Sequence, residues 1–267
     1  MGKIIAIANQ KGGTSKTTST VNIGVGLAKE GKKVLLIDID PQGNATSGLG
    51  INKEELENTV YEMMLGDCSV KQCMVKTEQE NLYVVPSSVN LAGIELEIST
   101  LKEPQYVLKN EVDYIKEDFD YIIIDCPPSL NMLTINAMTT ADSVLVPIQC
   151  EFYALEGLSQ LIHTINLVRD RLNPNLNIEG VVFTMYDART NLSAQVVIIG
   201  RGIAMAAFVA VGHQQSGMMV DTLLDGSIVT ELLIWLVIIV QTIGPALGQP
   251  LRTTLDAEVV ITLASQV

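Results

Sequence analysis

Short apolar runs alternate with helical patterns through residues 1–197, which is typical of a parallel sheet covered by helices. The predicted strands are Ile4–Ala8, Val34–Asp38, Leu82–Pro86, Tyr121–Asp125, Ser143–Ile148 and Ile178–Met185. The predicted helices are Thr17–Glu30, Lys53–Leu65, Tyr106–Glu117, Asn131–Thr140 and Glu156–Leu172. The second, fourth and fifth strands are almost continuously apolar, as expected when both faces of a sheet are covered. The pattern predicts an α/β fold with a doubly wound, mostly parallel sheet and helices on both faces.

The last seventy residues have a different character. Only seven residues from Ile198 onward are charged, against forty in residues 1–197. We therefore predict one domain at residues 1–197 and an atypical apolar segment at residues 198–267. This segment either packs on the same domain or is not native to the fold, as after a frameshift or a gene fusion.

Two unbroken apolar runs in this segment, Ile203–Val211 and Leu232–Val240, are shorter than the roughly eighteen residues of a membrane span. Extending the second run to Leu247 would include a glutamine, a threonine, a glycine and a proline. Buried strands or helices are the plainer interpretation, so no membrane association is expected.

The charge balance and the cysteines limit the class of protein. A net charge of −13 argues against a protein that coats nucleic acid through bulk positive charge. Any DNA contact would require a local basic patch. The four cysteines have no C-x-x-C spacing, and the N-terminus leads directly into a predicted strand rather than into a signal peptide. We expect a cytoplasmic protein with reduced thiols.

The most informative stretch joins the first predicted strand to the first predicted helix. It consists of Lys11, Gly12, Gly13, Thr14, Ser15, Lys16, Thr17 and Thr18. Such a strand, turn and helix place backbone N–H groups and a helix N-terminus around a phosphate. Lys16 would add positive charge for the outer phosphates, and the Thr17 hydroxyl is placed to ligate Mg²⁺. The strict pattern G-x-x-x-x-G-K-[ST] is not met, because Gln10 and Ser15 occupy its two glycine positions.

Three aspartates follow two of the buried strands. Asp38 and Asp40 lie two residues apart before a Pro-Gln-Gly turn, and Asp125 ends an apolar strand in a Walker-B pattern before two prolines. Ligands of doubly wound sheets bind at the carboxyl ends of the strands. A carboxylate there can orient water for attack on a γ-phosphate or support the shell of Mg²⁺. An acidic residue that merely ends a strand is the alternative for Asp38.

In this order the three motifs resemble the ParA/MinD family of ATPases, whose loop K-G-G-x-G-K-T-T is matched here everywhere except at Ser15. Residues 147–157 and 184–190 are similar to the chromosome-partitioning ParA/Soj branch rather than to MinD. The resemblance covers residues 1 to about 197. It implies a P-loop NTPase fold with three α/β/α layers.

The resemblance also implies roles for single residues toward ATP and Mg²⁺. Lys16 would stabilise the transferring phosphoryl group, and Asp40 would orient the attacking water. Met185, at a strand end, would border the nucleotide together with the loop from Lys11 to Thr18. The implied metal ligands or supports are Thr17, Asp38 and Asp125.

Partners follow from the same resemblance. Lys11 would reach the ATP bound to a second subunit, so that ATP joins a homodimer, and a ParB-like protein would activate slow hydrolysis during chromosome or plasmid partitioning. Arg189 matches a position that contributes to non-specific DNA binding. Two features argue in the opposite direction: Ser15 is expected to weaken nucleotide binding, and the tail offers only Arg201 and Arg252 to a DNA-binding surface.

Two other hypotheses remain open at this point. The chain could be a nucleotide-gated switch or scaffold with little or no ATP turnover, which a hydrolysis assay would distinguish. It could also be a membrane-associated, MinD-like member anchored by its two apolar runs, which flotation with liposomes would test. Residues 258–267 lack the basic amphipathic pattern of such an anchor.

Overall fold

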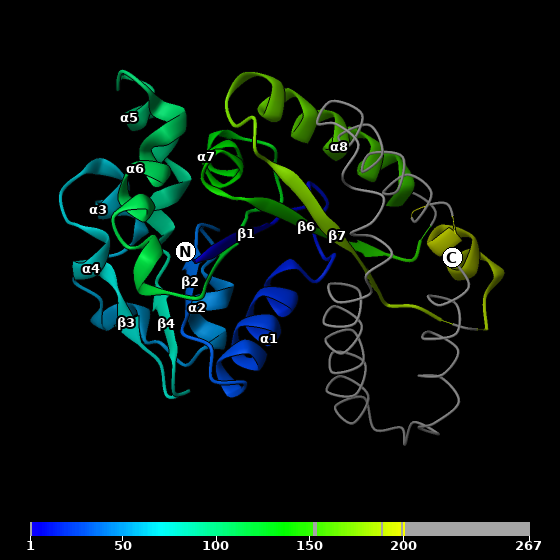
Figure 1. The fold of residues 1–267 in the computed structure, drawn as a ribbon, viewed down its shortest axis with the longest axis horizontal. Helices are drawn as coiled ribbons and strands as arrows, with labels where there is room; N and C mark the ends of the chain where they lie inside the picture. Colours follow the sequence, from blue (N-terminus) through cyan, green and yellow to red (C-terminus); the bar gives the residue numbers. More distant parts are fainter. Residues whose placement is uncertain (1, 152–153, 188, 199, 201–267) are drawn as a thin grey trace. The chain divides into compact units, whose positions relative to one another are not determined.

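The computed structural model describes residues 2–151, 154–187, 189–198 and 200. They contain a seven-stranded sheet in the order β3-β4-β2-β5-β1-β6-β7 (Figure 1). The strands are β1 (Lys3–Ile7), β2 (Val34–Asp38), β3 (Val75–Lys76), β4 (Leu82–Val85), β5 (Tyr121–Asp125), β6 (Ser143–Gln149) and β7 (Asn177–Thr184). Every pair is parallel except β3 with β4. The predicted α/β fold with a mostly parallel sheet is confirmed.

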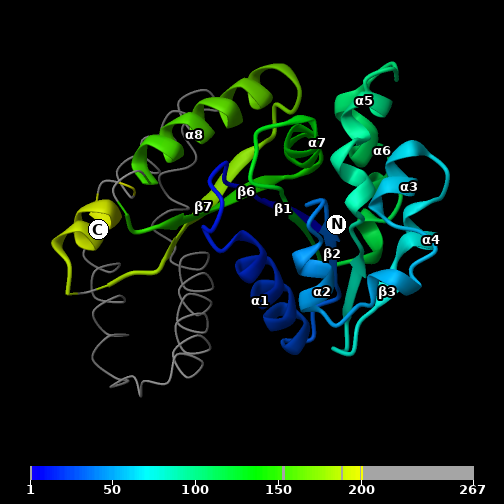
Figure 2. The same ribbon diagram turned by 180° about the vertical axis from the view of Figure 1, so that it is seen from behind.

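Helices cover both faces of this sheet. They are α1 (Lys16–Lys29), α2 (Asn44–Gly48), α3 (Val60–Leu65), α4 (Val70–Cys73), α5 (Ile94–Ile98), α6 (Val107–Asp113), α7 (Met132–Thr140) and α8 (Ala154–Arg171), and residues 191–198 are also helical. Helix α1 lies on one face, and α7 and α8 lie on the other (Figures 1 and 2). All five residues of β2 are buried, which explains why this strand is apolar up to its last residue.

Helix α1 packs unusually close to β2. A Cβ atom added to Gly24 would lie 2.8 Å from Cδ2 of Leu36, so this approach depends on the missing side chain. The helix ends at Lys29, and Gly31 follows with a φ of +80°, the left-handed conformation of a helix stop. The predicted end of this helix is therefore confirmed. The start of α1 lies beside the carboxyl ends of the central strands.

The predicted helix Lys53–Leu65 is wrong as a single element. Residues Lys53–Glu55 form a 3₁₀ turn, and α3 starts separately after Thr59. Thr59 has an extended backbone and forms a capping box with Glu62, so a helix cannot continue through it. The pattern also missed β3, α2, α4 and α5, whose two to five residues are too few to establish a period.

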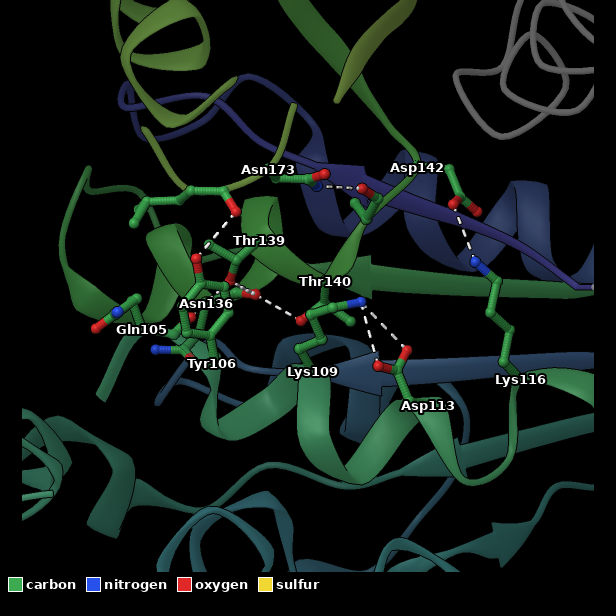
Figure 3. Close-up of polar contacts among 12 residues, drawn as sticks. Gln105, Tyr106, Lys109, Asp113, Lys116, Asn136, Thr139, Thr140, Asp142 and Asn173 are labelled. Carbon is green, nitrogen blue, oxygen red and sulfur yellow. Dashed lines mark hydrogen bonds and ion pairs between the residues drawn. The ribbon is translucent and has the colours of Figure 1, made fainter. Parts of the chain in front are cut away.

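Polar contacts connect the amino ends of several strands. These ends lie opposite the carboxyl ends, where the site described below is found. Figure 3 shows Lys116 reaching Asp142, with 3.0 Å between Nζ and Oδ1. The other carboxylate oxygen of Asp142 accepts a hydrogen bond from the backbone N–H of Ile4. Asn173 donates to the carbonyl oxygens of Met138 and Ala141. These contacts join the segments that precede β5, β6 and β7.

The predictions for residues 201–267, including the apolar runs Ile203–Val211 and Leu232–Val240, lie outside the described residues. Among the helices that the structure does describe, none combines the length and the hydropathy that crossing a bilayer requires.

Candidate active site

The loop Lys11–Thr18 joins β1 to α1 at the carboxyl ends of the central strands. Gly13 and Ser15 have left-handed backbones, with φ values of +76° and +68°. Thr14 and Lys16 are buried. The ammonium of Lys16 donates a hydrogen bond to the carbonyl oxygen of Lys11 at 3.0 Å, so its positive charge lies inside the curve of the loop.

Burial determines the electrostatics of Lys16. Removal from water lowers the pKa of the ammonium below its usual value, and the neighbouring Cys126, Asp125 and Asp40 act in the opposite direction. The buried ammonium of Lys16 at the N-terminus of α1 favours an anionic ligand. Phosphate groups supply such charge.

Asp125 and Asp38 lie directly side by side. They end β5 and β2, which are paired in parallel, and they occupy the same register position. Thr17 donates to Oδ2 of Asp125 at 2.8 Å. The Thr20 hydroxyl lies 2.9 Å from Oδ1 of Asp125, with the carbonyl oxygen of Lys16 also within hydrogen-bond distance. Of the predicted metal group, Thr17 from α1 is therefore in contact with Asp125, and Asp38 lies beside Asp125 on the neighbouring strand.

The two fully buried carboxylates are shifted in the same direction. Burial raises the pKa of Asp125 to about 7 and that of Asp38 to about 6; the charge of Asp38 adds to the rise at Asp125, and the charge of Asp40 adds to the rise at Asp38. Hydrogen bonds from Thr17 and Thr20 oppose the shift of Asp125, and those from Thr46 and Asp40 oppose the shift of Asp38. A bound cation would reverse the shift, because it favours the charged forms.

This shift predicts a pH-dependent stability in the absence of metal and nucleotide. A folded state with raised carboxyl pKa values binds more protons than the unfolded chain, so this contribution to stability is full below about pH 4 and lost as the pH rises to about 7. The expected loss is on the order of a few kcal/mol. Urea unfolding between pH 4 and 8 measures it, with Asp170→Ala as the control, because Asp170 is an exposed aspartate on α8. An Asp125→Asn variant with the slope of the unchanged protein would contradict the assignment.

The loop after β2 carries the third predicted aspartate. Asp40 is 7% exposed, and its Oδ1 accepts from the backbone N–H of Gln42 at 3.0 Å. Its backbone N–H donates to Asp38, whose other carboxylate oxygen accepts two hydrogen bonds from Thr46. Asp38 is thus occupied by groups of the protein itself, and its support of a metal shell stays a prediction.

The ends of β6 and β7 lie against the loop. Gln149 donates to the carbonyl oxygen of Gly13 at 2.7 Å and lies 3.1 Å from the sulfur of Met185. The hydroxyl of Thr184 lies 3.3 Å from the carbonyl oxygen of Thr14. Met185 is 67% exposed beside this loop, a position that suits the border of a nucleotide site.

Lys11 and Arg189 each have a partner in the same chain. Lys11 forms an ion pair with Glu151, which follows β6. Arg189 is exposed, and its guanidinium binds both carboxylate oxygens of Asp187, at 2.9 Å and 2.8 Å. This fork holds the pKa of Asp187 down at about 2. Both cations would have to exchange these partners to bind another molecule.

Several residues of the site were not predicted from the sequence. Thr20 was accessible to prediction, because it lies one helical turn after Thr17 and faces the same way. The other three are Thr46, Ser87 and Gln149, which come from separate strand ends and a short helix. Gln149 contacts the loop before α1, whereas Thr46 and Ser87 contact Asp38 and the Asp40 turn; the strand order brings Gln149 and Ser87 to these positions.

The donors fit a magnesium nucleotide. Thr17 and Asp125 offer hard oxygen ligands, and no group of three or more acidic, histidine or cysteine side chains that could hold a metal ion is found among the described residues. Mg²⁺ is commonly held in this way at phosphates, by one or two protein groups with water and phosphate oxygens. A loop between a central parallel strand and its helix, with a buried lysine and an adjacent strand-end aspartate, defines a P-loop nucleoside triphosphatase.

Comparisons with known proteins identify the family within this class. A family model described as an AAA domain matches residues 2–178. The sporulation initiation inhibitor protein Soj of Bacillus subtilis is 57% identical over 197 residues, which cover 74% of this chain and 78% of the relative. The chromosome partitioning protein ParA of Myxococcus xanthus is 49% identical over 202 residues, covering 76% and 71%. The chain belongs to the ParA/Soj family.

A solved structure supports the same conclusion for the fold. Cobyrinic acid a,c-diamide synthase from Mycobacterium smegmatis, with bound ADP and magnesium, superimposes with a TM-score of 0.72 at 40% identity. The match covers 76% of this chain and 82% of that protein. Its complex with an ATP analogue and magnesium gives the same values.

Ser15 replaces the glycine of the family loop. Its backbone is left-handed, a conformation that is less favourable for serine than for glycine. The conformation disfavours a serine by about 1–2 kcal/mol, and the larger entropy of unfolded glycine offsets part of that amount. We expect Ser15→Gly to raise the free energy of unfolding by up to about 1 kcal/mol and to increase nucleotide affinity. Denaturant unfolding and titration with ATP measure the two effects. No gain in ATP affinity in this variant would contradict the expectation.

Proposed function

We propose that the protein is an ATPase of the ParA/Soj type that binds ATP with Mg²⁺, dimerises on it and hydrolyses it slowly. The observation that carries the proposal is the convergence of Lys16, Asp125 and Asp40 at the carboxyl edge of the sheet, beside the loop before α1. The complexes of the similar synthase with ADP or an ATP analogue and magnesium support the choice of ligand.

Each residue has a distinct role in this proposal. Lys16 binds the outer phosphates and stabilises the negative charge that develops during transfer. Asp40 orients the attacking water and accepts its proton. Thr17 and Asp125 hold Mg²⁺, and Asp38 supports that shell. Bound Mg²⁺ neutralises phosphate charge. The loop from Lys11 to Thr18, including Gly12, Gly13, Thr14, Ser15 and Thr18, surrounds the phosphates, and Met185 borders the nucleotide.

Dimerisation assigns a role to Lys11. Its partner in a single chain is Glu151, so reaching the ATP of a second subunit requires this ion pair to open. The negative charge of a triphosphate supplies the competing attraction. ATP would thereby join two copies, and hydrolysis would release them.

The relatives named for chromosome partitioning suggest where the activity is used. We propose a role in partitioning a chromosome or plasmid in the cytoplasm, with a ParB-like activator as the partner. Turnover of ATP by the purified protein, alone and with DNA and a purified ParB homologue, tests this proposal. Turnover that rises with both additions supports it. No turnover under any of these conditions would favour a nucleotide-gated switch without hydrolysis.

Non-specific DNA binding is part of this proposal and depends on Arg189. Its exposed guanidinium can contact a phosphate once it leaves Asp187. We expect Arg189→Ala to weaken binding to any duplex sequence by a few-fold and to lower the salt slope of the affinity by about 1. Fluorescence anisotropy at several salt concentrations measures both, with Arg171→Ala as the matched control. An unchanged slope in Arg189→Ala would remove this residue from the DNA-binding surface.

A further inference from the structure

Four buried residues form a closed ring of hydrogen bonds around the backbone of Asp40. Asp40 donates its N–H to Oδ1 of Asp38 at 3.3 Å, and its carbonyl oxygen accepts a hydrogen bond from the hydroxyl of Ser87. The backbone N–H of Ser87 donates to Oγ1 of Thr46 at 2.9 Å. Thr46 closes the ring by donating its hydroxyl and its N–H to Oδ2 of Asp38, at 2.7 Å and 2.8 Å.

The ring is sealed from water. Asp38 and Thr46 are fully buried, Ser87 is 1% exposed and Asp40 is 7% exposed. The Thr46 hydroxyl uses its single hydrogen toward Asp38 and a lone pair toward Ser87, so its position is defined on both sides. Buried hydrogen bonds of this kind are costly to break, because no water replaces the lost partner.

The fold explains why the ring forms here. Strands β2 and β4 are paired in parallel up to Ile37 and Val85, and Asp40 and Ser87 lie just beyond those two ends. Thr46 lies on α2, which follows the Asp40 turn directly. The ring therefore connects the end of an adjacent strand to the loop that carries the water-orienting carboxylate.

We propose that Ser87 and Thr46 are positioning residues for hydrolysis, which fix the backbone of Asp40 and so the location of its carboxylate. The inference rests on the proposed ATPase function. A small misplacement of a catalytic group costs a large factor in rate, whereas nucleotide affinity depends mainly on the separate loop before α1. Loss of the Ser87 hydroxyl should therefore lower kcat and leave KM nearly unchanged.

The chain offers matched variants at both positions. Ser87→Ala removes the contact to Asp40, and Ser88→Ala is its control, because the Ser88 hydroxyl accepts from the N–H of Asn90 and has no contact with Asp40. Thr46→Val keeps the shape and removes the hydroxyl, whereas Thr46→Ser keeps the hydroxyl. The Ser87→Ala variant retains the hydrogen bond from Gly43 to the carbonyl oxygen of Asp40, so the loop keeps one tie.

The experiment combines steady-state ATP hydrolysis with hydrogen exchange of the backbone amides of Asp40, Gln42 and Gly43 in the protein without nucleotide. We expect Ser87→Ala and Thr46→Val to lower kcat by about 10-fold or more with KM within about 3-fold, and to accelerate exchange at the Asp40 amide. Ser88→Ala and Thr46→Ser should retain most of the turnover and the slow exchange.

Two results would overturn the proposal. One is unchanged kcat and unchanged exchange in Ser87→Ala. The other is impaired turnover in Thr46→Ser with retained turnover in Thr46→Val, which would assign the effect to packing of the methyl group instead of to the hydroxyl. If the unmodified protein does not hydrolyse ATP, the proposed ATPase function fails, and the exchange of Asp40 in Ser87→Ala still decides whether Ser87 fixes this backbone.

Discussion

Asp40→Ala is expected to reduce ATP turnover by about 10² to 10⁴-fold while ATP affinity stays within a few-fold of the unmodified protein. The carboxylate of Asp40 is buried at the strand ends, and its Oδ1 is held by the N–H of Gln42. Removal of the carboxylate leaves the attacking water without its proton acceptor. The loop and Lys16, which bind the phosphates, are not altered. Single-turnover phosphate release and equilibrium titration with ATP separate the two quantities.

Asp170→Ala is the control for this variant, since Asp170 is an exposed aspartate on α8, in a separate element from Asp40. Its turnover should match that of the unmodified protein. Equal loss of affinity and turnover in Asp40→Ala would indicate that Asp40 binds ATP rather than orienting water. Full turnover in Asp40→Ala would remove it from the mechanism.

Lys16→Ala is expected to lower both ATP affinity and turnover, with a loss of at least about 100-fold in kcat/KM. Lys16 is 7% exposed, and its ammonium lies inside the loop, where the low dielectric strengthens its attraction for phosphate. The same burial lowers the pKa of Lys16, because the charged ammonium is poorly solvated there. A bound anion would stabilise the charged form. Calorimetric titration and steady-state hydrolysis measure the two losses.

Lys29→Ala provides the comparison for Lys16→Ala, because both lysines lie on α1 and Lys29 is exposed at its far end. The control should bind and hydrolyse ATP normally. If the loop were only a structural turn, Lys16→Ala and Lys29→Ala would have the same ATP affinity and turnover. Equal values in the two variants would contradict a phosphate site at this loop.

Much of the fold was predictable because the buried strands are apolar over their whole length. The residues around Val34, Tyr121 and Ser143 signal strands covered on both faces, and all three strands lie inside the seven-stranded sheet with a neighbour on each side. The short elements were not predictable. Helix α2 has five residues and β3 has two, so neither leaves a period in the sequence.

The candidate site was predictable to the extent that its residues follow strand ends in chain order. Asp38 and Asp125 are far apart in sequence, and their common register follows from the pairing of β2 with β5. No sequence motif marks Thr46 or Ser87 as part of the site. Their hydrogen bonds depend on which strands are neighbours in the sheet. The glycine of the family loop at the position of Ser15 indicated that this residue could require a left-handed backbone, and the structure has one there.

The measurement that tests the central claim most directly is the mass of the Asp40→Ala protein in solution, with Mg²⁺ and either ATP or ADP. Sedimentation equilibrium distinguishes one chain from two. Blocked hydrolysis should preserve the ATP-bound state, so the account predicts a dimer with ATP and a single chain with ADP. The dimer should be lost in a second variant that also carries Lys11→Ala. The mass of a single chain under both conditions, with ATP bound, would contradict an ATPase that dimerises on its nucleotide.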